Sequence, residues 1–93
     1  MHILLIQAEL HLPMSHSLKE KRGVLKPLLH ELRRDFNLSV SEVEASNHWQ
    51  SAVVAAVGVS GLRRSLERLE RDFLHRLETN GSLQVVHYAA QWL

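Results

Sequence analysis

The sequence contains no cysteine, only two prolines and few aromatic residues, which make up 5% of its 93 positions. Without cysteine, neither disulfides nor a thiolate zinc site can hold the fold together. The longest stretch free of polar side chains, residues 52–59, is far shorter than the ~20 residues of a membrane span. The N-terminal residues show no basic lead before an apolar stretch, so we expect no signal peptide and a cytoplasmic location.

The rest of the composition is typical of one small globular domain, which we expect to span residues 1–93. Apolar residues at 45% and charged residues at 23% argue against disorder. The net charge of +1 by itself predicts no polyanionic partner. The placement of the charges is therefore more informative than their sum.

Hydrophobic periodicity predicts four strands and two helices in the order β-α-β-β-α-β. We expect strands over residues 1–12, 38–45, 49–59 and 83–92, a turn at 46–48, and helices over 17–36 and 61–79. Ser17 and Glu20 have the spacing of a capping box, and Ser60 is positioned to cap the second helix. Two similar β-α-β halves predict an α+β fold, a ferredoxin-like split β-α-β sandwich. Its four-stranded antiparallel sheet, in strand order 4-1-3-2, would carry both helices on one face.

The other face of such a sheet has no helix left to cover it. The third predicted strand is apolar on both faces, and the first adds further apolar residues. Exposed contiguous apolar patches usually mark interfaces, so we expect a homodimer or higher homo-oligomer through this face, formed by Ile3, Leu5, Ala52, Val54 and Ala56. The alternative is that the small residues make the patch too shallow to matter.

Three segments carry a family resemblance. His16-Ser-Leu-Lys-Glu-Lys-Arg22 opens the first helix, and Phe36-Asn-Leu-Ser-Val-Ser-Glu-Val43 and Trp49-Gln50 follow in order. Together they resemble the YlxP-like family, small bacterial proteins of unknown function. The resemblance implies the same ferredoxin-like fold and offers no catalytic residue. Genes of this family often lie among those for translation initiation and ribosome maturation factors, which implies a setting in ribosome biogenesis.

All eleven Lys and Arg residues lie within the two predicted helices. The first helix has six cations against three acids, a net +3, whereas the second has five against four. At helical spacing, one narrow sector of the first helix collects Lys19, Arg22, Lys26, His30 and Arg33. Such a row suits a phosphate backbone, although solvated charges are also ordinary on an outer helix. Lys21 points with the leucines instead, either as a structural residue or as an anion contact near the loop at 13–16.

The remaining signals do not identify a reaction. Seven histidines are scattered without metal-ligand spacing, so we predict no metal site and no cofactor. The loop at 12–17 lacks the arginine and glycines by which acylphosphatases, enzymes of this architecture, bind phosphate. Ser15 and His16 are neighbours, but adjacency alone does not make a nucleophile and its base. Trp49 could stack on a base, but we expect it to pack at the start of the third strand. Base stacking on the sheet is disfavoured because the first strand has no aromatic residue and the third has only Trp49 at its beginning.

Three hypotheses follow, and no catalytic residue is assigned in any of them. The first is a non-enzymatic protein associated with RNA or ribosomal components through Lys19, Lys21, Arg22, Lys26 and Arg33. The second is an oligomeric protein-interaction module that works through the open sheet face. The third is a small-anion site at the start of the first helix, where the helix dipole favours negative charge.

Overall fold

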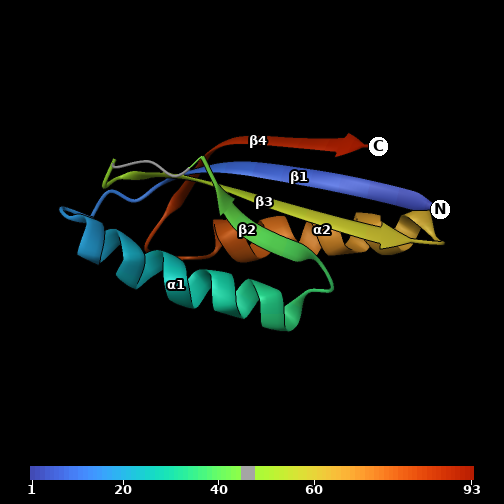
Figure 1. Ribbon diagram of the computed structural model, residues 1–93, viewed down its shortest axis with the longest axis horizontal. Helices are drawn as coiled ribbons and strands as arrows, with labels where there is room; N and C mark the ends of the chain where they lie inside the picture. Colours follow the sequence, from blue (N-terminus) through green and yellow to red (C-terminus); the bar gives the residue numbers. More distant parts are fainter. Residues whose placement is uncertain (45–47) are drawn as a thin grey trace.

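The computed structural model describes residues 1–44 and 48–93. Its elements follow the predicted order (Figure 1): β1 His2–His11, α1 Leu18–Asp35, β2 Ser39–Val43, β3 Ser51–Ser60, α2 Arg63–Glu78 and β4 Gln84–Trp92. The second predicted strand was expected to reach Ala45, and a turn was expected at 46–48. Residues 45–47 lie outside the described residues.

The four strands form one sheet in the order β2-β3-β1-β4. Each neighbouring pair is antiparallel. Figure 1 shows both helices on the same side of this sheet. The predicted strand order is the same order named from the opposite edge, so both the topology and the α+β ferredoxin-like arrangement are confirmed. The chain thus has one covered and one open sheet face.

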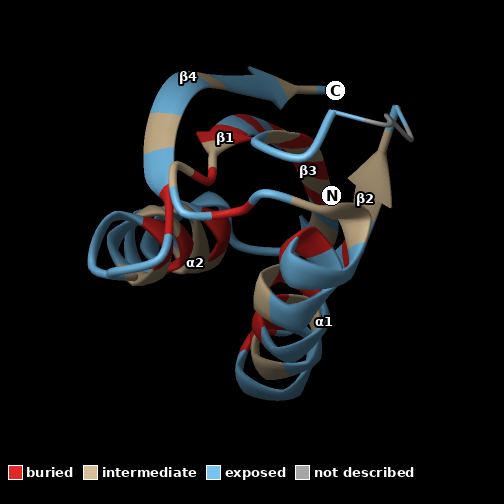
Figure 2. Ribbon diagram, turned by 90° about the vertical axis from the view of Figure 1, so that its left-hand side faces the viewer, coloured by how far each residue is buried: buried red, intermediate tan, exposed pale blue. Residues whose placement is uncertain are grey.

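The core lies between the sheet and the two helices. Alternate residues of β1 from Leu4 to Leu10 face it and are fully buried. Both helices bury a stripe at helical spacing against them, formed by Leu25, Leu28 and Leu32 of α1 and Leu66, Phe73 and Leu77 of α2. Phe36 contacts Phe73 edge to face, with ring centroids 5.6 Å apart. In Figure 2 the buried residues gather in this layer, and the outward sides of both helices are exposed.

The structure corrects the predicted oligomer interface. Ile6 pairs with Ala56 and Ala8 with Val54 across β1 and β3, so these residues share the covered face. Ala52, Val54 and Ala56 are at most 3% exposed, whereas Ile3 and Leu5 lie on the open face. The apolar row of β3 that accompanies them is Val53, Ala55, Val57 and Val59. Because β3 is apolar on both sides, its composition did not reveal which row faces the helices.

The two helix starts differ from each other. At α1 the capping prediction is confirmed, because the Glu20 amide donates to Ser17 Oγ over 3.1 Å. The Glu20 carboxylate completes the turn by accepting from the His16 amide over 2.6 Å. At α2 the prediction was wrong. Ser60 remains in β3, where its Oγ accepts from the Leu62 amide, and the helix begins at Arg63 without a side-chain cap.

Candidate nucleic-acid interface

The charged residues of α1 are sorted onto two opposite flanks. Its carboxylates Glu31 and Asp35 lie on the flank next to α2, where Arg76 Nη1 reaches an oxygen of each at 2.8 Å. Arg33 lies on the flank next to β2, where its Nε donates to the Val40 carbonyl over 2.9 Å. Two of the three acids of α1 therefore face α2, and Arg33 of the predicted row lies on the other flank, at the β2 edge of the sheet.

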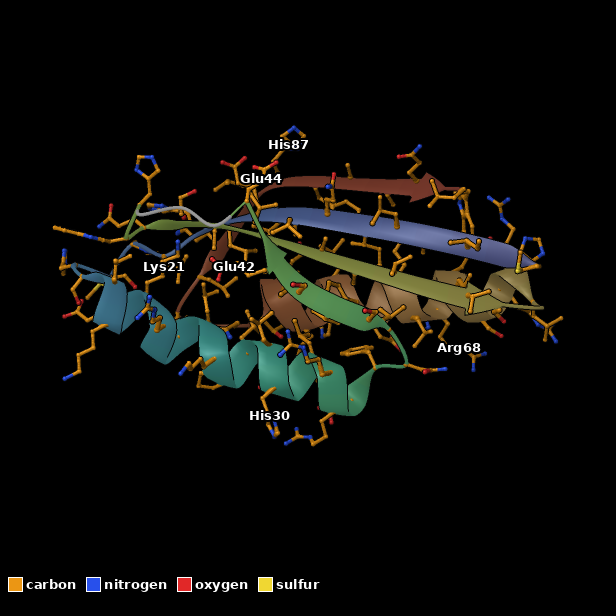
Figure 3. All side chains as sticks on the ribbon, in the orientation of Figure 1. Lys21, His30, Glu42, Glu44, Arg68 and His87 are labelled. Carbon is orange, nitrogen blue, oxygen red and sulfur yellow. The ribbon has the colours of Figure 1, made fainter. Side chains whose placement is uncertain are left out.

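We call this row the basic ridge: Lys19, Arg22, Lys26 and Arg33. All four residues are exposed. Within residues 1–44 and 48–93, none of the four lies within ion-pair distance of a carboxylate. His30 belongs to the same side of the helix, and Figure 3 shows its ring directed away from the sheet. The structure therefore brings together the predicted row as an exposed strip of positive charge.

Lys21 is not part of this strip. Its side chain is 4% exposed, Nζ donates to the His48 carbonyl over 3.0 Å, and Glu42 Oε2 lies 3.7 Å away. Figure 3 shows it between α1 and the strand layer, on the same side as Glu42. A lysine held in this way cannot be presented to a phosphate. The prediction of a nucleic-acid contact by Lys21 is corrected: the residue ties the first turns of α1 to the loop before β3.

A dense ion-pair network occupies the opposite flank of α1. Arg34 Nε lies 2.7 Å from Asp35 Oδ1, while Arg76 contacts the other oxygen. The guanidinium groups of Arg34 and Arg76 hold the pKa of Asp35 well below its usual range by hydrogen bonding and charge attraction. Arg76 also lies over the Phe36 ring, 5.2 Å from its centroid. These carboxylates are thus engaged away from the basic ridge.

The outward side of α2 mixes the two signs of charge. Arg63 pairs with Glu67, four residues along the helix, at 3.0 Å. Arg71 pairs with its neighbour Asp72, and Arg76 crosses to Glu31 of α1. Arg64 and Arg68 are exposed and have no ion pair within the part of the chain that the structure describes. Their neighbours on the helix include Glu67 and Asp72, which dilute the positive potential there.

Trp49 was expected to pack at the start of the third strand, and that expectation is wrong. β3 begins two residues later, and Trp49 is 52% exposed in the loop before it. It lines a hollow of about 440 Å³ together with His11, His48, Gln50 and Ser51. The sequence signal was present, because the polar pair Gln50-Ser51 separates Trp49 from the apolar alternation of β3.

Other candidate sites lack convergent groups. Ser15 is buried while His16 is exposed, so the pair is not presented together to a substrate. The Glu20 carboxylate and Ser17 hydroxyl already engage amides at the start of α1, where the small-anion site was expected. Among the residues outside 45–47, no three His, Asp or Glu side chains gather in a manner suited to a metal ion.

Neither helix within the described residues has the length and apolar composition needed to cross a membrane.

The fold and the exposed basic ridge define a class: a small ferredoxin-like α+β sandwich with a cationic first helix. The chain belongs to the family described as "Protein of unknown function (DUF503)", whose model matches residues 3–90. It is also 40% identical over 52 residues to the uncharacterized protein YlxP of Bacillus subtilis (strain 168). That match spans 56% of this chain and 56% of the Bacillus protein. The resemblance inferred from the three sequence segments is confirmed.

Proposed function

We propose that this protein is a non-enzymatic RNA-binding protein that contacts the phosphate backbone through the basic ridge. The observation that carries the proposal is the row of exposed cations on one flank of α1, with no ion pair among the described residues. Each Lys or Arg that neutralises a phosphate releases bound counterions, which favours association at low salt. Ribosomal partners belong to the same proposal and derive from the resemblance to the YlxP-like family. The cytoplasmic location stays an expectation from the sequence pattern.

The sheet offers a less suitable surface for RNA than the helix does. Proteins that read RNA on a sheet stack bases on aromatic side chains of the central strands. β1 and β3 are the central strands here, and neither contains Phe, Tyr or Trp. Tyr88 of β4 pairs with Ala8 and so lies on the covered face. The basic ridge is therefore the better candidate for the contact.

A matched pair of variants tests the proposal. Lys19→Gln/Arg22→Gln/Lys26→Gln neutralises three ridge residues, and Arg64→Gln/Arg68→Gln/Arg71→Gln removes three cations from α2. Binding of single-stranded RNA is measured over a series of salt concentrations. We expect the ridge variant to lower the slope of log K against log salt by about 2, since each lost contact contributes about 0.7. The α2 variant should stay close to wild type, and equal slopes for all three proteins would contradict the proposal.

A second candidate function uses the open sheet face as a contact between two copies of this chain. On that face Val57 and Val59 are 37% and 60% exposed, beside the partly exposed Ile3 and Leu5. A two-fold axis lets one patch serve both subunits, because each subunit presents the same surface to the other. This apolar patch contains no charged residue, so its self-association carries no like-charge repulsion.

Light scattering tests this second candidate. Val59→Asp places a charge in the patch. Val86→Asp is the matched control: Val86 is 56% exposed and lies in β4, at the irregularity where it has no pairing partner in β1. Val54 is unsuitable for such a test because it is fully buried. We expect wild type and Val86→Asp to be dimeric and Val59→Asp to be monomeric. A monomeric wild type would exclude this function.

A further inference from the structure

Trp49 is the one aromatic residue among the large hydrophobic side chains that are exposed within residues 1–44 and 48–93. It forms part of a hollow with a polar rim, the 440 Å³ space described above. His11 Nδ1 lies 3.1 Å from the Gln50 carbonyl, and Gln50 Nε2 donates to the Pro13 carbonyl over 3.2 Å. These hydrogen bonds connect the loop that carries Trp49 to the end of β1 and to the residues that follow it.

The loop that carries Trp49 is bonded to the start of α1. The hollow beside it opens on the uncovered sheet face, because His11 and Ser51 pair in the row of β1 and β3 residues that faces away from the helices. The Lys21 ammonium binds the carbonyl of His48, the residue directly before Trp49. Lys19 and Arg22 flank Lys21 on the first turns of α1 and are exposed. Figure 1 shows the start of α1 and the start of β3 at the same end of the molecule. An apolar ring and two exposed cations thus lie at the same end of the molecule, where a single strand passing around that end would meet both.

We propose that Trp49 is a stacking platform for an unpaired base of the RNA that the basic ridge holds by its phosphates. This inference rests on the proposed function and adds the ligand class: single-stranded RNA, not a duplex. Single-strand binders combine cations that follow the backbone with aromatic rings that stack on bases.

His11 offers a polar contact beside the indole. Since a carbonyl only accepts, His11 Nδ1 donates to the Gln50 carbonyl, and Nε2 of the neutral ring remains an acceptor for a base amino group.

Three RNA probes separate stacking from backbone contact. The first is a single strand of about 12 nucleotides, within the usual site sizes; the second is the same strand with abasic sugars, and the third is its duplex. Trp49→Ala should weaken binding of the first probe by about 5- to 150-fold, the range for loss of one stacked base. Its affinity for the abasic strand and the duplex should equal that of wild type. Trp49→Phe should retain most of the affinity, because it keeps a flat aromatic ring.

The ridge variant Lys19→Gln/Arg22→Gln/Lys26→Gln distinguishes the two proposals. If it loses affinity for every probe while Trp49→Ala binds the first probe like wild type, the stacking inference is overturned and the proposed function stands. If wild type binds no probe in a salt-dependent manner, both are overturned. Thermal unfolding of Trp49→Ala controls for folding, and quenching of tryptophan fluorescence in wild type but not in Trp49→Phe reports the stacked base directly.

Discussion

The outward sides of α1 and α2 carry similar residues in different arrangements. Both helices bury an apolar stripe against the same sheet face, and both expose several Lys or Arg side chains. On α1 the acids Glu31 and Asp35 face α2, and Arg33 of the basic ridge lies at the β2 edge. On α2 the acids Glu67 and Asp72 stand between the arginines and pair with them. The order of charges along a helix, more than their number, therefore decides whether a cationic surface forms.

Arg76 links the two helices. It extends from α2 to Glu31 and Asp35, which lie on the inner flank of α1 by their positions along the helix. A long arginine with a planar guanidinium can hold two carboxylates at once, and lysine cannot reproduce that geometry. The carboxylates that lie away from the ridge are thus neutralised by a residue of α2.

Removal of the Lys21 charge should have the largest effect on stability. Lys21→Met retains the apolar stem but leaves the His48 carbonyl and Glu42 without the ammonium. We expect a loss of about 2 kcal/mol in the free energy of unfolding, typical of a lost hydrogen bond to a charged group. Urea denaturation measures it, with Lys26→Met, an exposed ridge residue, as a control expected within about 0.5 kcal/mol of wild type. Equal stability of the two variants would contradict the structural role of Lys21.

Breaking the link between the helices should have a smaller effect. Arg76→Ala removes two ion pairs and the contact with the Phe36 ring. Because the Arg76 side chain is 34% exposed, we expect a loss of about 1 kcal/mol. Arg71→Ala, whose single ion pair is more exposed, should stay within about 0.5 kcal/mol of wild type in the same denaturation experiment. A larger loss in Arg71→Ala than in Arg76→Ala would refute this ranking.

Removal of the acids on α2 should make it resemble α1. Glu67→Gln/Asp72→Asn releases Arg63 and Arg71 from their ion pairs. If the proposed RNA binding holds, we expect affinity for single-stranded RNA to rise by about 2- to 5-fold at low salt. Glu9→Gln/Glu44→Gln changes net charge equally but on the opposite side of the molecule, and should raise affinity less. An equal gain in both variants would mean that net charge, not its arrangement, governs binding.

The smallest effect concerns pH. The folded state lowers the pKa of Asp35 through Arg34 and Arg76, so the unfolded carboxyl takes up a proton at higher pH than the folded one. The stabilisation is complete above the ordinary aspartate pKa of about 3.9 and declines as the pH falls below it. The difference in unfolding free energy between wild type and Asp35→Asn should therefore shrink as the pH falls below about 4. A difference that stays constant on acidification would contradict this assignment.

Much of this architecture could be predicted from the sequence, because each helix and strand has a recognisable pattern of apolar and capping residues within its own segment. The Ser17 cap, the leucine stripes and the strand order follow from spacing and connection rules. The face of β3 could not be predicted, since Ala52 and Val53 are equally acceptable in a core and only the register with β1 separates them. For Trp49 the polar pair Gln50-Ser51 was the one indication of a loop, because an aromatic residue next to a strand otherwise suits either a core or a loop. The helical spacing placed Lys21 correctly, but its partners come from distant segments.

The bond from Lys21 to the loop before β3 also has a thermodynamic consequence. It holds the loop that carries the indole to the start of the helix that carries the ridge, so a ligand that touches both meets a preorganised surface. Association then need not order the loop again, and more of the contact energy remains as affinity. If the proposed RNA binding holds, the same rigidity would favour nucleic-acid chains in which the distance between a backbone phosphate and an unstacked base matches this surface.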